Sequence, residues 1–250
     1  MIKESKAPIF KILANLPKNT RILDIGGASA PFKRATNIID AVPFENINWS
    51  QAKGEGEVMF DKNSYTQFDI CAREKWPFAD KEFDYSTCSH VLEDIRDPLW
   101  VCSEIIRVSK AGYIEIPSKL YETTFGLEAK NLAGASHHRW LVDLYDNKLR
   151  FTFKYFYVHS HSVNKNYKKV NLKNESMYLK LEWSDSFSCF ENWLNSGKEI
   201  FEFFLDIKIT DKEMWRIFRK NSSKNIAFKW LAYLKNTNPL FKNIFNKVTK

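Results

Sequence analysis

Two acids and two glycines within the first forty residues have the types and spacing of a nucleoside-binding site. Asp24 lies in the apolar stretch 22–25, which Gly26 and Gly27 close, and this pattern predicts a buried strand that ends in a glycine turn. A second apolar stretch ends in Asp40. The glycines let the backbone approach a ligand, and an acid after the second strand can accept hydrogen bonds from ribose hydroxyls.

The glycine turn itself restricts the kind of ligand. Residues 26–29 read Gly-Gly-Ala-Ser rather than G-x-G-x-x-G, and no P-loop lysine follows them. The turn therefore favours a nucleoside that lacks a pyrophosphate. Only about ten residues, Pro31 among them, separate it from the second apolar stretch, so a helix in this connection must be short.

The rest of the first 160 residues predicts an α/β fold. After a helix over 2–16, apolar stretches predict five strands, at about 21–25, 37–41, 65–70, 83–88 and 113–116. Asp97 and Pro98 are typical of a helix start, and that helix should run to about residue 110. Strands separated by helices predict a Rossmann-like, doubly wound sheet that is mostly parallel.

A hairpin should complete this sheet. The stretches 139–145 and 149–157 flank Asp146-Asn147, a turn-forming pair, and predict two antiparallel strands. We expect them to be the last two strands of the sheet. The sequence thus predicts a Rossmann-like domain over 1–160 and a helical, basic C-terminal extension over 161–250.

The order of the motifs between residues 20 and 118 resembles the class I S-adenosylmethionine-dependent methyltransferases of the type 11 group. After the glycine turn come Gln-Phe-Asp-Ile at 67–70 and Cys-Ser-His-Val-Leu-Glu-Asp at 88–94, in the family's order. The segment 138–151 resembles, more weakly, a subgroup of these enzymes that is found with bacterial surface-glycan assembly.

The resemblance implies that S-adenosylmethionine is the cofactor, and it assigns a role to eight residues. It implies that the methionine part lies near Asp24, Gly26, Gly27 and Ala28, and that the ribose lies at Asp40. The adenine would contact Asp69 and Ile70, and Ser89 would lie beside both the cofactor and the acceptor. Each acid has a structural alternative. Asp24 can cap the loop after its strand, Asp40 can be a turn residue, and Asp69 can be a solvated strand end.

Four residues are candidates for catalysis. His90 follows the fourth strand, and a general base or a packing role are both open to it. The family usually has Glu-His where this chain has Glu93-Asp94, so a base at that position would be Asp94. His137 and His138 precede the hairpin on the acceptor side of this fold, as acceptor contacts, bases or structural residues. Adjacent residues on a strand point in opposite directions, so no metal site is expected.

Composition and charge limit the partners. No apolar run approaches the ~20 residues of a membrane span, which indicates a cytoplasmic protein. Of 38 basic residues, nine lie in 216–250 without a single acid, and the remainder is close to neutral with 29 bases against 30 acids. Lysines interleaved with aromatic residues suit an anionic membrane surface. Nucleic acid is the less favoured partner, because no RNA-binding motif accompanies this segment.

The sequence therefore predicts a cytoplasmic S-adenosylmethionine-dependent methyltransferase, placed peripherally at the inner membrane face, that O-methylates a sugar or another group on a surface-glycan precursor. Two alternatives stay open. One is a methyltransferase for RNA or a small metabolite, which the neutral charge of the body disfavours in the case of RNA. The other is a protein that keeps the fold for binding and has lost catalysis, as the short connection after the glycine turn and the missing Glu-His suggest.

Overall fold

The structure is a computed structural model that describes residues 1–5, 8–124, 127–128, 132–155, 177–196, 199–200 and 202–203. The basic segment 216–250 and most of the helical extension expected after residue 160 lie outside these ranges. Within them, every helix is too short or too polar to cross a membrane.

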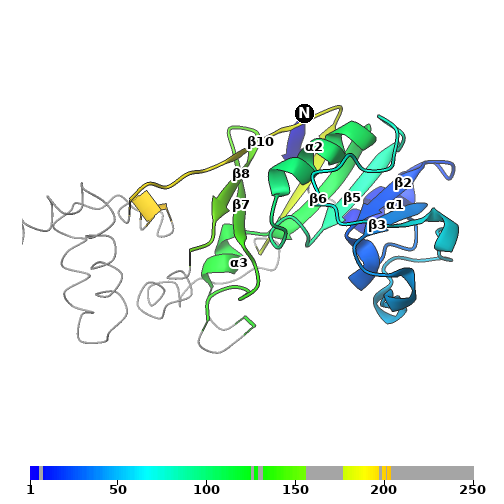
Figure 1. The fold of residues 1–250 in the computed structure, drawn as a ribbon, viewed down its shortest axis with the longest axis horizontal. Helices are drawn as coiled ribbons and strands as arrows, with labels where there is room; N and C mark the ends of the chain where they lie inside the picture. The colour runs from blue at the N-terminus through cyan, green and yellow to red at the C-terminus, as the bar shows by residue number, and fades with distance from the viewer. Residues whose placement is uncertain are drawn as a thin grey trace, which may run out of the picture.

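A seven-stranded sheet forms the centre of the molecule (Figure 1). Across the sheet the strands are β1 (Ile2–Glu4), β9 (Tyr178–Ser184), β6 (Ala111–Pro117), β5 (Tyr85–Ser89), β2 (Ile22–Ile25), β3 (Asn37–Asp40) and β4 (Tyr65–Gln67). The five strands from β6 to β4 are parallel, and β9 is antiparallel to both of its neighbours. The predicted α/β class with a mostly parallel, doubly wound sheet is confirmed.

The predicted hairpin forms, but it lies in another sheet. The strands β7 (Trp140–Tyr145) and β8 (Lys148–Phe153) are antiparallel, and β10 (Ser188–Glu191) pairs with β8 to make a separate three-stranded sheet. Asp146 and Asn147 between them both have positive φ, as a tight hairpin turn requires. The hairpin cannot extend the main sheet, because β9 pairs with β6 along the whole of that strand.

Part of the described chain beyond 160 is thus β-structure within the two sheets. β9 joins the main sheet and β10 joins the hairpin, although both follow the boundary expected from the sequence. In the segment expected to be helical from 184 onward, Phe190 lies in β10. The antiparallel position next to β6 is filled from this later part of the chain.

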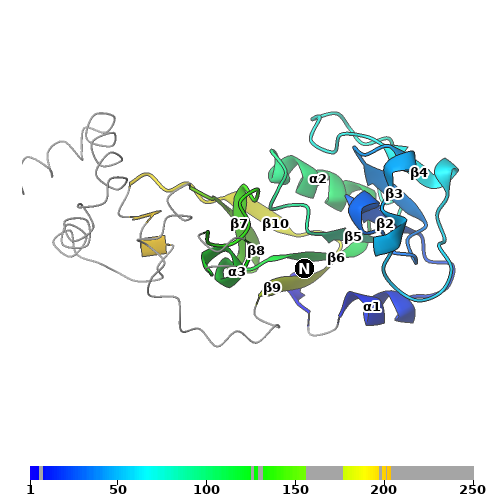
Figure 2. The same ribbon diagram turned by 90° about the horizontal axis from the view of Figure 1, so that it is seen from below.

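Helices cover the two faces of the main sheet (Figure 2). On one face, α1 (Ile9–Asn15) buries Ile9 and Leu13 against Ile22 of β2 and Ile38 of β3. On the other, α2 (Pro98–Val108) packs against the alternate residues of the same strands. The helix expected over 2–16 is shorter than predicted, because residues 2–4 pair with β9 and Pro8 caps the helix that follows.

The helix α2 begins as the sequence predicts. Asp97 caps it by accepting a hydrogen bond from the backbone N–H of Trp100 at 3.2 Å, and Pro98 is its first residue. The remaining helices are short: α3 (Lys119–Thr123) and the single turns η1 (Gly27–Ser29), η2 (Phe44–Asn46), η3 (Trp49–Gln51) and η4 (Lys62–Ser64). The turn η1 is the shortened connection expected after the glycine turn.

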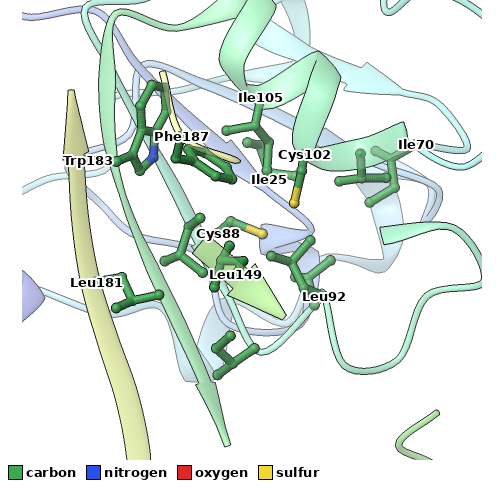
Figure 3. Close-up of a cluster of buried hydrophobic side chains, with 14 of the residues drawn as sticks. Ile25, Ile70, Cys88, Leu92, Cys102, Ile105, Leu149, Leu181, Trp183 and Phe187 are labelled. Atoms are coloured by element: carbon green, nitrogen blue, oxygen red, sulfur yellow. The ribbon is translucent and has the colours of Figure 1, made fainter. Parts of the chain in front are cut away.

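The largest buried cluster joins the two sheets (Figure 3). Cys88 of β5, Leu149 of β8 and Leu181 of β9 all belong to it and are almost inaccessible to solvent. Cys102 and Ile105 of α2 complete the packing between helix and strands. Burial of each such aliphatic side chain contributes about 1.5–3 kcal/mol, so this cluster holds the hairpin against the strands that carry the site.

Candidate functional site

The strand order defines where a ligand should bind. From β2 the order runs to β3 and β4 on one side, and to β5 and β6 on the other. Open α/β sheets bind ligands outside the carboxyl ends of the strands at this point of reversal. The loop after β2 and the residues after β5 meet there, so the sheet brings Gly26 and Gly27 beside Ser89 and His90.

The side chain of Asp24 is buried, and it connects β2 to β5 and to the backbone at Phe32. Its carboxylate is 2% exposed and accepts hydrogen bonds from the Thr87 hydroxyl at 2.7 Å and from the backbone N–H of Phe32 at 3.0 Å. Burial raises the pKa of Asp24 to about 6. These contacts fit the loop-capping alternative, and the predicted proximity to the methionine part stays a prediction.

Both glycines of the turn are required by close contacts. Gly26 has a left-handed backbone with φ of 68°, and a Cβ there would lie 2.5 Å from Cγ2 of Val91. A Cβ on Gly27 would lie 2.3 Å from Oδ2 of Asp24. A side chain at either position would therefore displace Val91 or Asp24, and the approach of this backbone to a ligand stays a prediction.

Asp40 connects the end of β3 to the glycine loop. Its Oδ2 accepts a hydrogen bond from the backbone N–H of Ala28 at 2.9 Å, and its Oδ1 accepts one from Val42 at 2.9 Å. A carboxylate has about four lone-pair sites, so both oxygens keep capacity for further donors. Asp40 is half-buried and can present these lone pairs to ribose hydroxyls at the mouth of the loop.

Asp69 and Ile70 follow β4 and have different surroundings. Asp69 is half-exposed and forms an ion pair with Arg96 at 2.7 Å, which lowers its pKa, and it also accepts from the N–H of Cys71. Ile70 is 7% exposed and packs in the cluster between α2 and the sheet. No local spacing indicates Arg96 as the ion-pair partner of Asp69, because the two residues are 27 positions apart.

His90 is held between two acids. Its Nδ1 lies 3.5 Å from Glu93 and its Nε2 lies 3.8 Å from Glu115, while its ring contacts Tyr178 edge-on at 5.2 Å. The carboxylates of Glu115 and Glu93 raise the pKa of His90 to about 9. An imidazolium has no lone pair to accept a proton, so this pKa favours a hydrogen-bond donor role for His90 at neutral pH, and its role as a general base stays a prediction.

A second polar cluster gathers the other three catalytic candidates. His137 and His138 lie directly before β7, and their Nε2 atoms face the carboxylate of Asp94 at 3.9 and 3.8 Å. His138 is buried, and its Nδ1 shares a 2.5 Å hydrogen bond with Glu122. Burial alone would lower the pKa of His138, but the hydrogen bond with Glu122 raises this pKa above its usual value.

A buried ion pair supports this cluster. Glu122 also accepts a hydrogen bond from Nζ of Lys154, and both side chains are inaccessible to solvent. Lys154 donates further to the carbonyl of Ala135 at 2.7 Å. Lys154 and Glu115 were not predicted as site residues, because their partners come from other segments of the chain and no local spacing relates either residue to its partner.

Aromatic rings link the two clusters. Tyr178 contacts the ring of His90, and Tyr121 lies 5.8 Å from Tyr178 and 6.1 Å from the ring of His138. His90 follows β5, Tyr121 lies in α3 after β6, and Tyr178 begins β9. All four catalytic candidates therefore lie in one region at the carboxyl end of the sheet, and the cofactor candidates lie in the neighbouring loops.

A family model described as a methyltransferase domain matches residues 38–114, from β3 into β6. This match supports the predicted enzyme class, a methyltransferase of the kind that uses S-adenosylmethionine. It includes Asp40, Asp69, Ile70 and Ser89 among the predicted cofactor residues. No curated protein matches the chain.

Several solved structures are similar to part of the chain. They include an S-adenosylmethionine-dependent methyltransferase from Mesorhizobium loti, with 16% identity over 60% of this chain and 65% of that chain and a TM-score of 0.33. The YcgJ protein from Bacillus subtilis matches with 22% identity, 44% and 49% coverage and a TM-score of 0.31. An arsenic(III) S-adenosylmethionine methyltransferase from Chlamydomonas reinhardtii matches with 16% identity, 46% and 50% coverage and a TM-score of 0.31. The similar part spans less than two thirds of each of these chains.

Proposed function

We propose that this chain is an S-adenosylmethionine-dependent methyltransferase that transfers a methyl group to a hydroxyl of a sugar, or to another group, on a surface-glycan precursor. The observation that carries the proposal is the hydrogen bond between Ala28 N–H and Asp40. It unites the glycine loop after β2 with the acid at the end of β3, at the point where the strand order reverses, and this is where such sheets bind nucleosides.

The reaction sets three requirements for the protein. The acceptor oxygen forms a bond to the methyl carbon while the carbon–sulfur bond breaks in line, sulfur keeps the electron pair, and the hydroxyl proton leaves. The site must hold the nucleoside, align the acceptor with the sulfonium, and provide a group that takes the proton. A methyltransferase fold that lacks only the last two of these features could bind the cofactor but could not turn it over.

The loops after β2, β3 and β4 would hold the cofactor. Asp40 would accept hydrogen bonds from the ribose hydroxyls, and Gly26 and Gly27 would let the backbone approach the methionine part. Asp69 would face the adenine amine while Arg96 keeps it ionised, and Ser89 would lie between the cofactor and the acceptor. Asp24 is a positioning residue in this arrangement, because it holds the loop to β5 through Thr87.

The acceptor side is a mixture of charged and aromatic groups. Asp94 lies beside His137 and His138, and the rings of Tyr121 and Tyr178 lie between this cluster and His90. Polar groups that converge next to aromatic faces suit an acceptor with both hydroxyls and apolar C–H surface, as sugars have. Asp94 is partly exposed and lies beside two histidines, and it would take the hydroxyl proton.

The sequence of the segment 216–250 supports a location at the inner membrane face, where lipid-linked glycan precursors are found. Each basic residue near an anionic surface contributes about 1 kcal/mol, so nine are sufficient for reversible docking. The near-neutral charge of the remainder disfavours a polyanionic acceptor such as RNA in the catalytic part.

Transfer of a labelled methyl group tests this function. The purified chain would be incubated with methyl-labelled S-adenosylmethionine and, in parallel, lipid-linked glycan precursors, soluble sugars or RNA. We expect label in the glycan fraction with the native chain and with the control Asp146→Asn in the exposed hairpin turn, and none with Asp40→Ala. Label that appears only in RNA, or equal labelling by Asp40→Ala, would contradict the proposal.

A further inference from the structure

Three side chains at the carboxyl end of the sheet converge on one point. Nε2 of His137 and Nε2 of His138 face opposite oxygens of Asp94, at 3.9 and 3.8 Å. One ligand atom from each residue lies within 4.8 Å of the others. Two imidazole nitrogens and a carboxylate oxygen are a common donor set for a divalent transition metal.

The backbone explains how two adjacent histidines can converge. Neighbouring side chains diverge on a strand, and for that reason no metal site was expected, but the two histidines precede β7, which begins at Trp140. The N–H groups of Arg139 and Trp140 both donate to the carbonyl of Glu93, at 2.7 and 3.0 Å. These hydrogen bonds fasten the segment before β7 alongside residues 93–94, so the histidines are held next to Asp94 whether or not a ligand is present.

Both histidines have an acid on the side away from Asp94. Nδ1 of His138 is hydrogen-bonded to Glu122 at 2.5 Å, and Glu122 is itself fixed by the buried Lys154. Nδ1 of His137 lies 3.8 Å from Glu128. A carboxylate at Nδ1 places the proton there, leaves the Nε2 lone pair free, and is the usual outer partner of a metal-binding histidine.

One carboxylate oxygen at the convergence point is buried without a hydrogen bond from the described part of the chain. Among the described residues, no donor bonds to Oδ1 of Asp94 although this atom is buried, and the same is true of both carboxylate oxygens of Glu93, whose side chain is 1% exposed. Buried oxygens without partners cost free energy, and most such groups in proteins have a protein, water or ion partner. A cation between Asp94 and the histidines would supply one.

We propose that Asp94, His137 and His138 bind a divalent transition metal of the zinc type. Zinc lies 2.0–2.2 Å from such ligands, which places ligand atoms about 3.3 Å apart in a tetrahedron. The two nitrogen–oxygen separations are about 0.5 Å longer, and all three ligand atoms lie within 4.8 Å of one another; the side chains of His137 and Asp94, 61% and 37% exposed, can rotate to close these distances. Three protein ligands leave one position open, as in catalytic rather than structural zinc sites.

The open position gives the site a role in acceptor binding, and this part alone rests on the proposed function. A hydroxyl oxygen bound there would be polarised by the cation and would lose its proton more readily, and the oxygen of Asp94 that does not bind the cation would accept that proton. Metal binding by the three side chains does not depend on that role. It would hold equally if the fold served only for binding.

Zinc binding to the full, tag-free chain tests the proposal. After treatment with chelator and buffer exchange, Zn²⁺ would be titrated calorimetrically into the native chain and into Asp94→Asn, His137→Asn and the matched control His90→Asn, and Co²⁺ would be followed by its visible absorption. We expect one equivalent to bind to the native chain and to the control, since Asn tolerates the positive φ of His90. Affinity should fall at least tenfold in the two ligand variants.

Two results would overturn the proposal. One is the absence of stoichiometric zinc binding by the folded native chain. The other is equal affinity in the native chain, Asp94→Asn and His137→Asn, which would place the ion elsewhere. Thermal unfolding of each variant shows whether it is folded, and S-adenosylhomocysteine binding measured on the same samples separates failure of the metal site from failure of the methyltransferase proposal.

Discussion

The backbone N–H of Ala28 donates a 2.9 Å hydrogen bond to the carboxylate of Asp40, so the acid at the end of β3 fixes the glycine loop that follows β2. The N–H of Val42 donates to the other oxygen of the same carboxylate. One side chain therefore shapes the loop and also faces the position expected for the ribose. A change at Asp40 should affect ligand binding through both effects.

Alanine at the glycine turn should disturb both stability and binding. A Cβ on Gly27 would lie 2.3 Å from Oδ2 of Asp24 and would push that carboxylate from its hydrogen bonds. We expect Gly27→Ala to lower the free energy of unfolding by about 1–3 kcal/mol, the usual cost of overpacking, and to weaken S-adenosylhomocysteine binding at least tenfold. Urea unfolding and calorimetry measure the two effects.

Gly56 offers a matched control for this substitution. Unlike Gly27 it has a positive φ, of 82°, and a Cβ there would meet no atom within 4 Å. Gly56→Ala should cost only the backbone strain of about 1 kcal/mol and leave ligand binding unchanged. Equal effects of the two alanines on binding would refute the role given to the loop.

The burial of Asp24 should make stability depend on pH. Its folded pKa is raised from 3.8 to about 6 in a site that also faces Lys53 and Asp40. The folded state thus binds the proton more tightly, and the contribution of Asp24 is greatest below pH 3.8 and is lost as pH rises through 6. At 1.36 kcal/mol per pKa unit the loss is about 3 kcal/mol.

Asp24→Asn isolates this effect from the other acids. The amide stays uncharged at every pH, so the difference in unfolding free energy between native chain and variant should change by about 3 kcal/mol between pH 7 and pH 4, in favour of the native chain at low pH. Urea unfolding at several pH values measures this difference. Parallel stability profiles would show that Asp24 titrates normally.

His90 should remain protonated at neutral pH. Glu115 and Glu93 raise its pKa to about 9, and Tyr178 is the remaining titratable group against its ring. Because the pKa is raised on folding, the stabilisation from this charge is complete below pH 6.5 and is lost as pH rises toward 9. NMR titration of the imidazole should give a midpoint well above 6.5, and Glu115→Gln should lower it. A midpoint near 6.5 in both proteins would contradict the assignment.

The buried pair of Glu122 and Lys154 should be sensitive to the loss of one partner. Lys154→Met leaves the carboxylate of Glu122 without its buried cation, and we expect it to cost about 3–5 kcal/mol. The double variant Glu122→Gln, Lys154→Met removes both charges and should recover most of that loss. Urea unfolding of the native chain and the two variants checks the order, and a single variant as stable as the native chain would be inconsistent with it.

Local patterns in the sequence were sufficient for the parallel part of the fold. The apolar stretches at β2, β3 and β4 and the Asp97-Pro98 start of α2 each carry their signal within a few residues, and the structure has them where they were predicted. β9 was missed even though Leu179, Leu181 and Trp183 alternate with polar residues. Its partner is 67 residues earlier at the centre of the pairing, and nothing local indicates which strand it joins.

The same difference between local and long-range signals applies to the candidate site. The residues of the glycine loop and Asp40 follow strands directly, so their position at the carboxyl end of the sheet could be predicted. The cluster around His138 could not, because Glu122, Asp94 and Lys154 reach it from three separate segments. The direction of adjacent histidines depends on whether they lie on a strand, and the expectation that they form no metal site applied the geometry of a strand to two residues that precede β7.

Calorimetric binding of S-adenosylhomocysteine to the purified chain tests the central claim most directly. The account predicts binding with micromolar affinity to the native chain and to Asp146→Asn, and affinity at least tenfold weaker for Asp40→Ala, which loses the acid that accepts from Ala28 and faces the ribose. Failure of the folded native chain to bind S-adenosylhomocysteine would contradict the account.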